Sequence, residues 1–342
     1  MMERLVPLLD LALLYLIMVV PATVLGKGIL VLRRRLSNEV SDFGSSLNYF
    51  ILIGAVLFPV LWMIGALVHQ AESDQLEIAC AVGHVTRDLG REGLNLLLAT
   101  LGGALIFIAF LIFRHYREAR EAEALSPSSR QMRRLRDLCA HHPQLARIGH
   151  RIVGIAEPDG RICTRGYLRP RIEVSVSVLE TLNDDWLVAA LLHEVEHLRH
   201  RDPLRYLVAH FSSLLNPTSF LLKGEFTRWK RAREVACDRF AVVAGAHPLS
   251  LAQALVAVAK NDVSEHQGRV GIHSAGFSWL QVRVRLLLNY TNDPPDNHRP
   301  QYFPTPVLMI ALPLIIPHYA GTRPLTFLHH SVESALSWSG FL

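Results

Sequence analysis

Two histidines and a glutamate in the run His193-Glu194-Val195-Glu196-His197 have the clearest chemical potential in this chain. On an α-helix, residues four positions apart lie on one face, so both imidazoles can reach a single metal ion. The glutamate between them, Glu194, can act as a general base toward the attacking water. This arrangement is typical of a zinc peptidase. Because the chain holds 17 histidines, so short a pattern needs support from its surroundings.

The residues around this motif predict the helix that it requires. Apolar side chains recur at positions 187, 190, 191, 195 and 198, which is the spacing of one helical face. The polar residues 183–185 precede them as candidate N-terminal caps. Pro203 disfavours the helical conformation of the residue before it, so the helix is expected to end near residues 201–202.

A catalytic zinc site needs a third protein ligand from another part of the chain. A further histidine six residues after His197, as in metzincins, is absent because that position is Pro203. A second helical pattern at 231–241 offers Glu234, with Asp238 one turn later on the same face. We expect Glu234 to be the third ligand and Asp238 to accept a hydrogen bond from a zinc histidine.

These residues resemble the BlaR/MecR-type integral-membrane zinc peptidases, which are related to the HtpX and CAAX-processing group of gluzincins. The resemblance covers roughly residues 140 to 290, and it rests on the segments 163–174, 193–204, 215–217, 233–239 and 283–288. A cysteine, Cys237, directly before Asp238 favours the BlaR/MecR branch over the HtpX branch, where alanine is usual. The same cysteine is otherwise expected to be a small buried packing residue.

One departure from that family concerns the signal. Members that sense β-lactams carry an external penicillin-binding module with S-x-x-K and K-T-G motifs, whereas only residues 321–342 follow the last apolar segment here. We therefore do not expect this chain to be an antibiotic sensor by itself.

Composition and apolar runs predict a membrane protein. Half of the 342 residues are hydrophobic (50%) and only 19% are charged. The runs Leu5 to Leu25, Leu47 to Val68 and Gly93 to Phe113 each reach the ~20 residues that cross a bilayer. Tyr302 to Ala320 is a fourth candidate, interrupted by prolines. The expected fold is a mainly α membrane protein with about four transmembrane helices and an inserted α+β gluzincin-like zinc peptidase domain.

The distribution of charge predicts the orientation in the membrane. Lys27 and three arginines lie in the loop 27–46, and seven arginines lie in 114–136, whereas the loop 69–92 has two arginines against five acidic residues. The positive-inside rule then places the N-terminus outside and the zinc domain in the cytoplasm, in a multi-pass plasma (inner) membrane. Arginines beside the spans would contact anionic lipid, which accounts for the net charge of +5 without direct nucleic-acid binding.

The expected organisation is a three-span region at 1–116, a linker at 117–131, a cytoplasmic zinc peptidase domain at 132–301, and a fourth transmembrane helix with a short external tail at 302–342. Within the domain, strict alternation over 172–178 predicts a strand, either a core strand or one that takes the substrate as an added strand. Its candidate substrate-binding residues are Ile172, Val174 and Val176. Residues 204–222 predict a helical hairpin near the membrane or a core helix, and further helices are expected at about 226–245, 248–261 and 277–289.

The expected activity is hydrolysis of peptide bonds in a protein or peptide substrate by one Zn²⁺ per chain, held by His193, His197 and Glu234. Glu194 would remove the proton of the attacking water and pass it to the leaving amine. The resemblance suggests a signalling or regulatory role, for example cleavage of a transcriptional repressor. A membrane-protein quality-control protease of HtpX type and an inactive receptor or scaffold remain alternatives.

Four further residues are candidates for supporting roles. Tyr167, Arg283 and Arg285 are candidate donors to the oxyanion. Asp202 is expected to cap the helix after Pro203 or to pair with an arginine. The sequence leaves the oligomeric state open.

Overall fold

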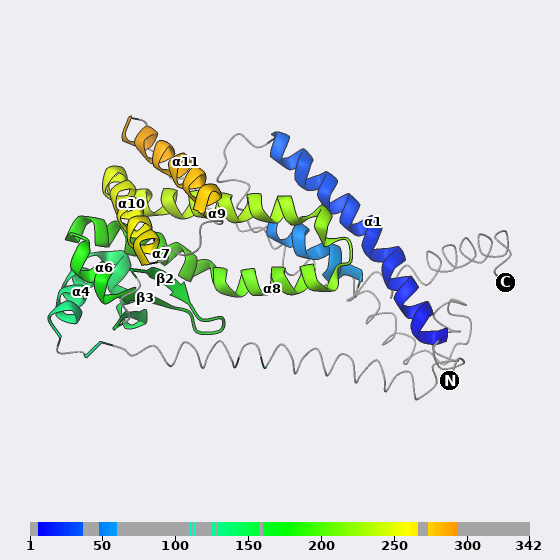
Figure 1. Cartoon of the computed structure of the whole chain (residues 1–342), viewed down its shortest axis with the longest axis horizontal. Helices are drawn as coiled ribbons and strands as arrows, with labels where there is room; N and C mark the ends of the chain where they lie inside the picture. The colour runs from blue at the N-terminus through cyan, green and yellow to red at the C-terminus, as the bar shows by residue number, and fades with distance from the viewer. Residues whose placement is uncertain are drawn as a thin grey trace.

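The computed structural model describes residues 6–36, 48–59, 110, 113, 125–126, 129–156, 160–265 and 273–292. These residues are mostly helical, with one small sheet, as the sequence predicts (Figure 1). The expected spans at 93–113 and 302–320 lie outside the described residues, apart from Phe110 and Phe113, as does most of the linker. No helix in the described part of the chain is both long enough and apolar enough to cross a membrane.

A three-stranded sheet forms from residues 152–175. It contains β1 (Ile152–Ile155), β2 (Ile162–Arg165) and β3 (Arg171–Ser175) in the order β1-β3-β2. Strand β3 pairs in parallel with β1 and antiparallel with β2. Gly166 follows β2 with φ at 98°, and a Cβ there would lie 3.1 Å from the backbone oxygen of Arg169, so this turn requires glycine.

The structure corrects the predicted strand at 172–178 and the substrate role given to it. Strand β3 ends at Ser175, whose side chain caps the short helix α6 (Val176–Thr181) by accepting from the backbone of Val178. Ile172 and Val174 are fully buried in the central strand, which has partners on both edges. Ile172, Val174 and Val176 therefore present no open strand edge to a substrate, and alternation alone could not show which strand was central.

Helix α7 (Asp184–His200) packs on β2 and β3. Its N-cap is Asn183, whose side chain accepts from the backbone N–H of Trp186, in agreement with the predicted cap. The apolar face of α7 joins the main core, together with residues of α4 (Arg130–His141), α10 (Pro248–Glu265) and α11 (His273–Asn292). Burial of this face fixes the side of α7 that carries the histidines.

Two long helices lead away from the sheet and back again (Figure 1). Helix α8 (Asp202–Leu215) runs outward, the short turn η4 (Ser219–Leu221) reverses the chain, and α9 (Lys223–Val243) returns to pack against α7. The predicted hairpin at 204–222 is thus a helix followed by a turn. The outer part of the pair packs in a second core with α1 (Val6–Leu36) and the helical residues 48–59.

Polar contacts tie α1 to the outer end of this pair. Asn216 donates to Thr23 Oγ1 at 2.9 Å, and both side chains are buried. Arg34 forms a salt bridge of 3.0 Å with the buried Glu225 at the start of α9. The N-terminal helix therefore packs with the outer parts of α8 and α9 in the second core.

Candidate metal centre

The two histidines of the motif and Glu234 converge on one point. His193 and His197 lie one turn apart on α7, and their ring centroids are 5.0 Å apart. Nε2 of His193 lies 3.6 Å from Oε2 of Glu234, and Nε2 of His197 lies 3.6 Å from Oε1. Ligand atoms about 2.1 Å from a tetrahedral zinc ion are roughly 3.4 Å from one another, so this spacing fits a shared ion.

The other nitrogen of each ring faces a buried carboxylate. Nδ1 of His193 lies 2.9 Å from Oδ1 of Asp238 on α9, and Nδ1 of His197 lies 2.7 Å from Oδ2 of Asp202 on α8. A carboxylate at Nδ1 fixes the tautomer and leaves Nε2 free to bind a metal. The two rings are therefore held in the orientation that a metal site requires.

Cys237 competes with Glu234 as the third ligand, because ligand atoms of His193, His197 and Cys237 all lie within 4.8 Å of one another. However, Sγ of Cys237 approaches Nδ1 of His197, at 3.6 Å, and that nitrogen already faces Asp202. Burial raises the pKa of the Cys237 thiol well above its ordinary value. Glu234 faces the Nε2 atoms of both rings, whereas Cys237 lies on the Nδ1 side of His197.

Arg283 of α11 contacts two carboxylates of α9, Glu234 and Asp238. It donates to both oxygens of Asp238, each at 2.7 Å, and its NH1 lies 3.0 Å from Oε2 of Glu234. Its side chain is 11% exposed. A planar guanidinium suits such a two-carboxylate contact. Of the other two candidate oxyanion donors, Arg285 is exposed on α11, and Tyr167 lies in the turn after β2.

These charges govern the protonation of the cluster. Burial alone would lower the pKa of His193, but hydrogen bonding to Asp238 and Glu234 raises it to about 9. Burial alone would raise the pKa of Glu234, but Arg283 and His193 hold it well below its ordinary value. The metal-free cluster thus pairs a protonated imidazole with ionised carboxylates, and a metal ion would take the place of that proton.

Glu194 occupies the face of α7 that turns toward the sheet. The hydroxyl of Thr164, on β2, lies 2.8 Å from Oε2 of Glu194 and 3.1 Å from its backbone oxygen, so it can donate to either. Glu194 is 8% exposed. The hydroxyl of Thr164 fixes the direction of a carboxylate that lies between the two histidines in the sequence.

The neighbouring Glu196 points elsewhere. One of its oxygens lies 2.8 Å from Nε2 of His200 and the other 3.5 Å from Arg199. Glu196 is therefore ion-paired and buried. His200 is bound in this pair and is absent from the contacts around Glu234.

Sequence reasoning missed Thr164 and also Arg233, which donates to Oδ2 of Asp202 at 2.9 Å. It gave Asp202 and Arg283 no link to the histidines. A threonine on a strand or an arginine on a helix carries no motif, so only their placement reveals them. Asp202 had one signal, its position five residues after His197 in a polar exit from the helix.

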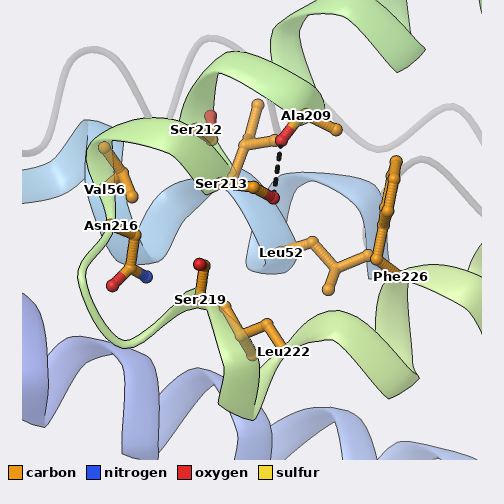
Figure 2. A pocket seen from close by; sticks show the side chains of 10 residues that line it. Leu52, Val56, Ala209, Ser212, Ser213, Asn216, Ser219, Leu222 and Phe226 are labelled. Atoms are coloured by element: carbon orange, nitrogen blue, oxygen red, sulfur yellow. Dashed lines mark hydrogen bonds between the residues drawn. The ribbon is translucent and has the colours of Figure 1, made fainter.

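A small cavity where residues 48–59 meet α8, η4 and α9 does not belong to this cluster. Leu52, Ser212, Asn216 and Phe226 help to line it, and Figure 2 shows Ser213 donating to the backbone oxygen of Ala209 at its edge. Its volume of about 20 Å³ suits one water molecule and excludes a peptide.

Two imidazoles on one helix, a carboxylate from a second helix and a glutamate beside them are the types of group that a metallopeptidase uses to bind its metal and activate water. The family model described as BlaR1 peptidase M56 matches residues 13–284, and the chain belongs to this family. The resemblance found in the sequence is thereby confirmed. No curated protein and no solved structure is significantly similar to the chain.

Proposed function

We propose that the protein is a zinc-dependent endopeptidase in which His193, His197 and Glu234 hold the metal. The observation that carries this proposal is the orientation of the two rings, with both Nε2 atoms 3.6 Å from Glu234 oxygens. Zinc suits this set of two imidazoles and one carboxylate, which leaves one position open. The side chain of Glu234 is 30% exposed, so the Nε2 side of the cluster is reachable from solvent.

Zinc bound there would polarise the scissile carbonyl and lower the pKa of water near it. Glu194 acts as the general base that takes the proton of the attacking water and returns it to the leaving amine. Thr164 keeps the Glu194 carboxylate in position by donating to Oε2. Asp238 holds the ring of His193, and Arg283 holds Glu234 and Asp238.

The substrate backbone would align along β2. Among the described strands, β2 pairs only with β3 and so has one open edge. Its residue Thr164 contacts Glu194, so β2 runs beside the proposed base. A peptide that adds to the edge would be bound through its backbone, with little dependence on its sequence. This replaces β3 as the substrate strand.

We further propose that the enzyme lies in the plasma (inner) membrane with its zinc domain in the cytoplasm and cleaves a regulatory protein such as a repressor. The apolar runs and the arginine distribution support the membrane, and the family match begins at residue 13, within the first apolar run. Exposed apolar side chains on α1, such as Leu25 (65%) and Leu36 (73%), suit contact with lipid. A quality-control protease would share this site.

Zinc content and cleavage of a peptide library test the enzymatic proposal. The full chain, purified in detergent, is analysed for zinc and incubated with a library made by digesting cell proteins. New termini in the library with wild type, and their loss with Glu194→Gln at unchanged zinc content, are expected. Bound zinc with the same termini in both proteins would contradict the role of Glu194. Bound zinc with no cleavage by either would favour an inactive receptor.

A trapping experiment distinguishes the substrate classes. Glu194→Gln, expressed in intact cells and crosslinked, should retain its substrate for mass spectrometry. Capture of one regulatory protein supports the signalling role, whereas capture of many unrelated membrane proteins supports quality control.

A further inference from the structure

We propose that Asp202 is the positioning residue of His197, so that the start of α8 is part of the metal centre. This inference rests on the proposed zinc site. Asp202, at the start of α8, would hold the ring of His197 in the way that Asp238 on α9 holds the ring of His193. The two rings come from one helix, and the carboxylates that hold them come from two others.

The Asp202 carboxylate is buried and faces this cluster. Its residue has no exposed surface. Oδ2 lies 2.7 Å from Nδ1 of His197 and accepts from Nε and NH2 of Arg233, at 3.1 and 2.9 Å. Oδ1 lies 3.6 Å from NH1 of Arg205. The carboxylate is therefore held by cations on α9 and α8 while it faces the ring.

A strained backbone brings Asp202 to this place. Arg201 has φ 51° and ψ 45°, and it is the only non-glycine with positive φ among the described residues. The left-handed conformation ends α7 and starts α8 at the next residue, so the Asp202 side chain turns back toward His197. A side chain of the L configuration rarely adopts this conformation without support from its surroundings. The support here is the buried ion pair that follows it.

The contact of Arg233 with Asp202 links the partner of His197 to α9, the helix that carries Asp238, the partner of His193. Arg233 and Glu234 are adjacent, so the residue that anchors Asp202 precedes the proposed metal ligand directly. Arg205 extends the anchor outward, because its backbone oxygen accepts from the hydroxyl of Tyr49 at 3.1 Å. The orientation of His197 thus depends on α8 and α9 together.

Replacement of Asp202 by asparagine tests this role. The amide oxygen can still accept from His197 and Arg233, but the charge that holds the ring is lost. Loss of such a partner lowers metal affinity by about 10- to 100-fold. The measurement is the zinc dissociation constant of the full chain by competition with a chromophoric chelator, with circular dichroism and the thermal midpoint of each metal-free protein alongside it.

Glu225→Gln is the matched control. Glu225 is also a buried carboxylate, 3% exposed, and it is also paired with two arginines, Arg34 and Arg228. It has no contact with either histidine. The expected result is weaker zinc binding in Asp202→Asn only, with thermal midpoints of the two variants lowered alike. Zinc affinity of Asp202→Asn equal to wild type, or an equal loss in Glu225→Gln, would overturn the inference.

A second pair of variants serves if Asp202→Asn does not fold. The side chain of Arg201 is exposed, so only its backbone conformation matters to the site. Arg201→Gly should keep zinc affinity, and Arg201→Val should lower it because a β-branched residue resists positive φ. Equal affinity in both would overturn the inference. If the wild-type protein binds no zinc, the proposed function fails together with this inference. If the wild-type protein binds zinc and the variants bind it equally well, only the positioning role of Asp202 fails.

Discussion

The guanidinium of Arg283 lies 3.0 Å from Oε2 of Glu234, although α11 and α9 are separated by the whole of α10 in the chain. The same group makes two hydrogen bonds of 2.7 Å to Asp238. One residue of α11 therefore restrains both the proposed metal ligand and the partner of His193. This relationship makes α11 part of the metal centre without its touching a histidine.

Arg283→Lys should weaken zinc binding, because a single ammonium group cannot meet both carboxylates with the geometry of a guanidinium. We expect a loss of about tenfold, the lower end of the range for lost ligand partners. The exposed Arg285 on the same helix gives the control, Arg285→Lys, which should bind zinc as wild type does. Equal zinc dissociation constants for the two variants would contradict the restraint.

Zinc affinity should rise with pH in the neutral range. The pKa of His193 is about 9 in the metal-free cluster, so below that pH a proton must leave before zinc binds. Release of one proton raises the association constant up to about tenfold for each pH unit as the pH increases toward that pKa. Chelator competition at about pH 6, 7 and 8 measures the slope, and a constant affinity over this range would show that His193 binds no proton there.

Thr164→Val should lower the turnover number without changing zinc affinity. The hydroxyl donates to a proposed base that touches no metal ligand, and hydrogen bonds to charged groups contribute about 1.5–3 kcal/mol. If about 1.4 kcal/mol of this free energy is lost from the transition state, the turnover number falls roughly tenfold. Thr227→Val removes a hydroxyl that bonds to the backbone of α9 at Lys223 and should leave turnover unchanged. A normal rate in Thr164→Val would remove Thr164 from the mechanism.

The sequence predicts those parts of the site that depend on helical period. His193, His197 and Glu194 share one helix, and Glu234 and Asp238 share another, so spacing of three and four residues is enough to relate them. The helices at 223–243, 248–265 and 273–292 agree with the predicted ones at about 226–245, 248–261 and 277–289. The observed ends lie within four residues of the predicted ones.

The parts that the sequence could not show depend on tertiary placement. Asp202 reaches His197 only because Arg201 adopts a left-handed conformation. The presence of an arginine in the sequence does not predict that conformation. The position of β3 between two other strands was equally hidden, because alternation looks the same in a central strand and in an edge strand. The predicted domain boundaries and membrane topology stay predictions.

The ligands of the bound metal test the central claim most directly. X-ray absorption spectroscopy of the zinc-loaded full chain should show imidazole nitrogen and carboxylate or water oxygen at about 2.0–2.2 Å and no sulfur. Glu234→Gln should lose most of its zinc, while Cys237→Ser should keep it and give the same spectrum as wild type. A zinc–sulfur distance of about 2.3 Å that disappears in Cys237→Ser would contradict the account, because the metal would then be held by Cys237 in place of Glu234.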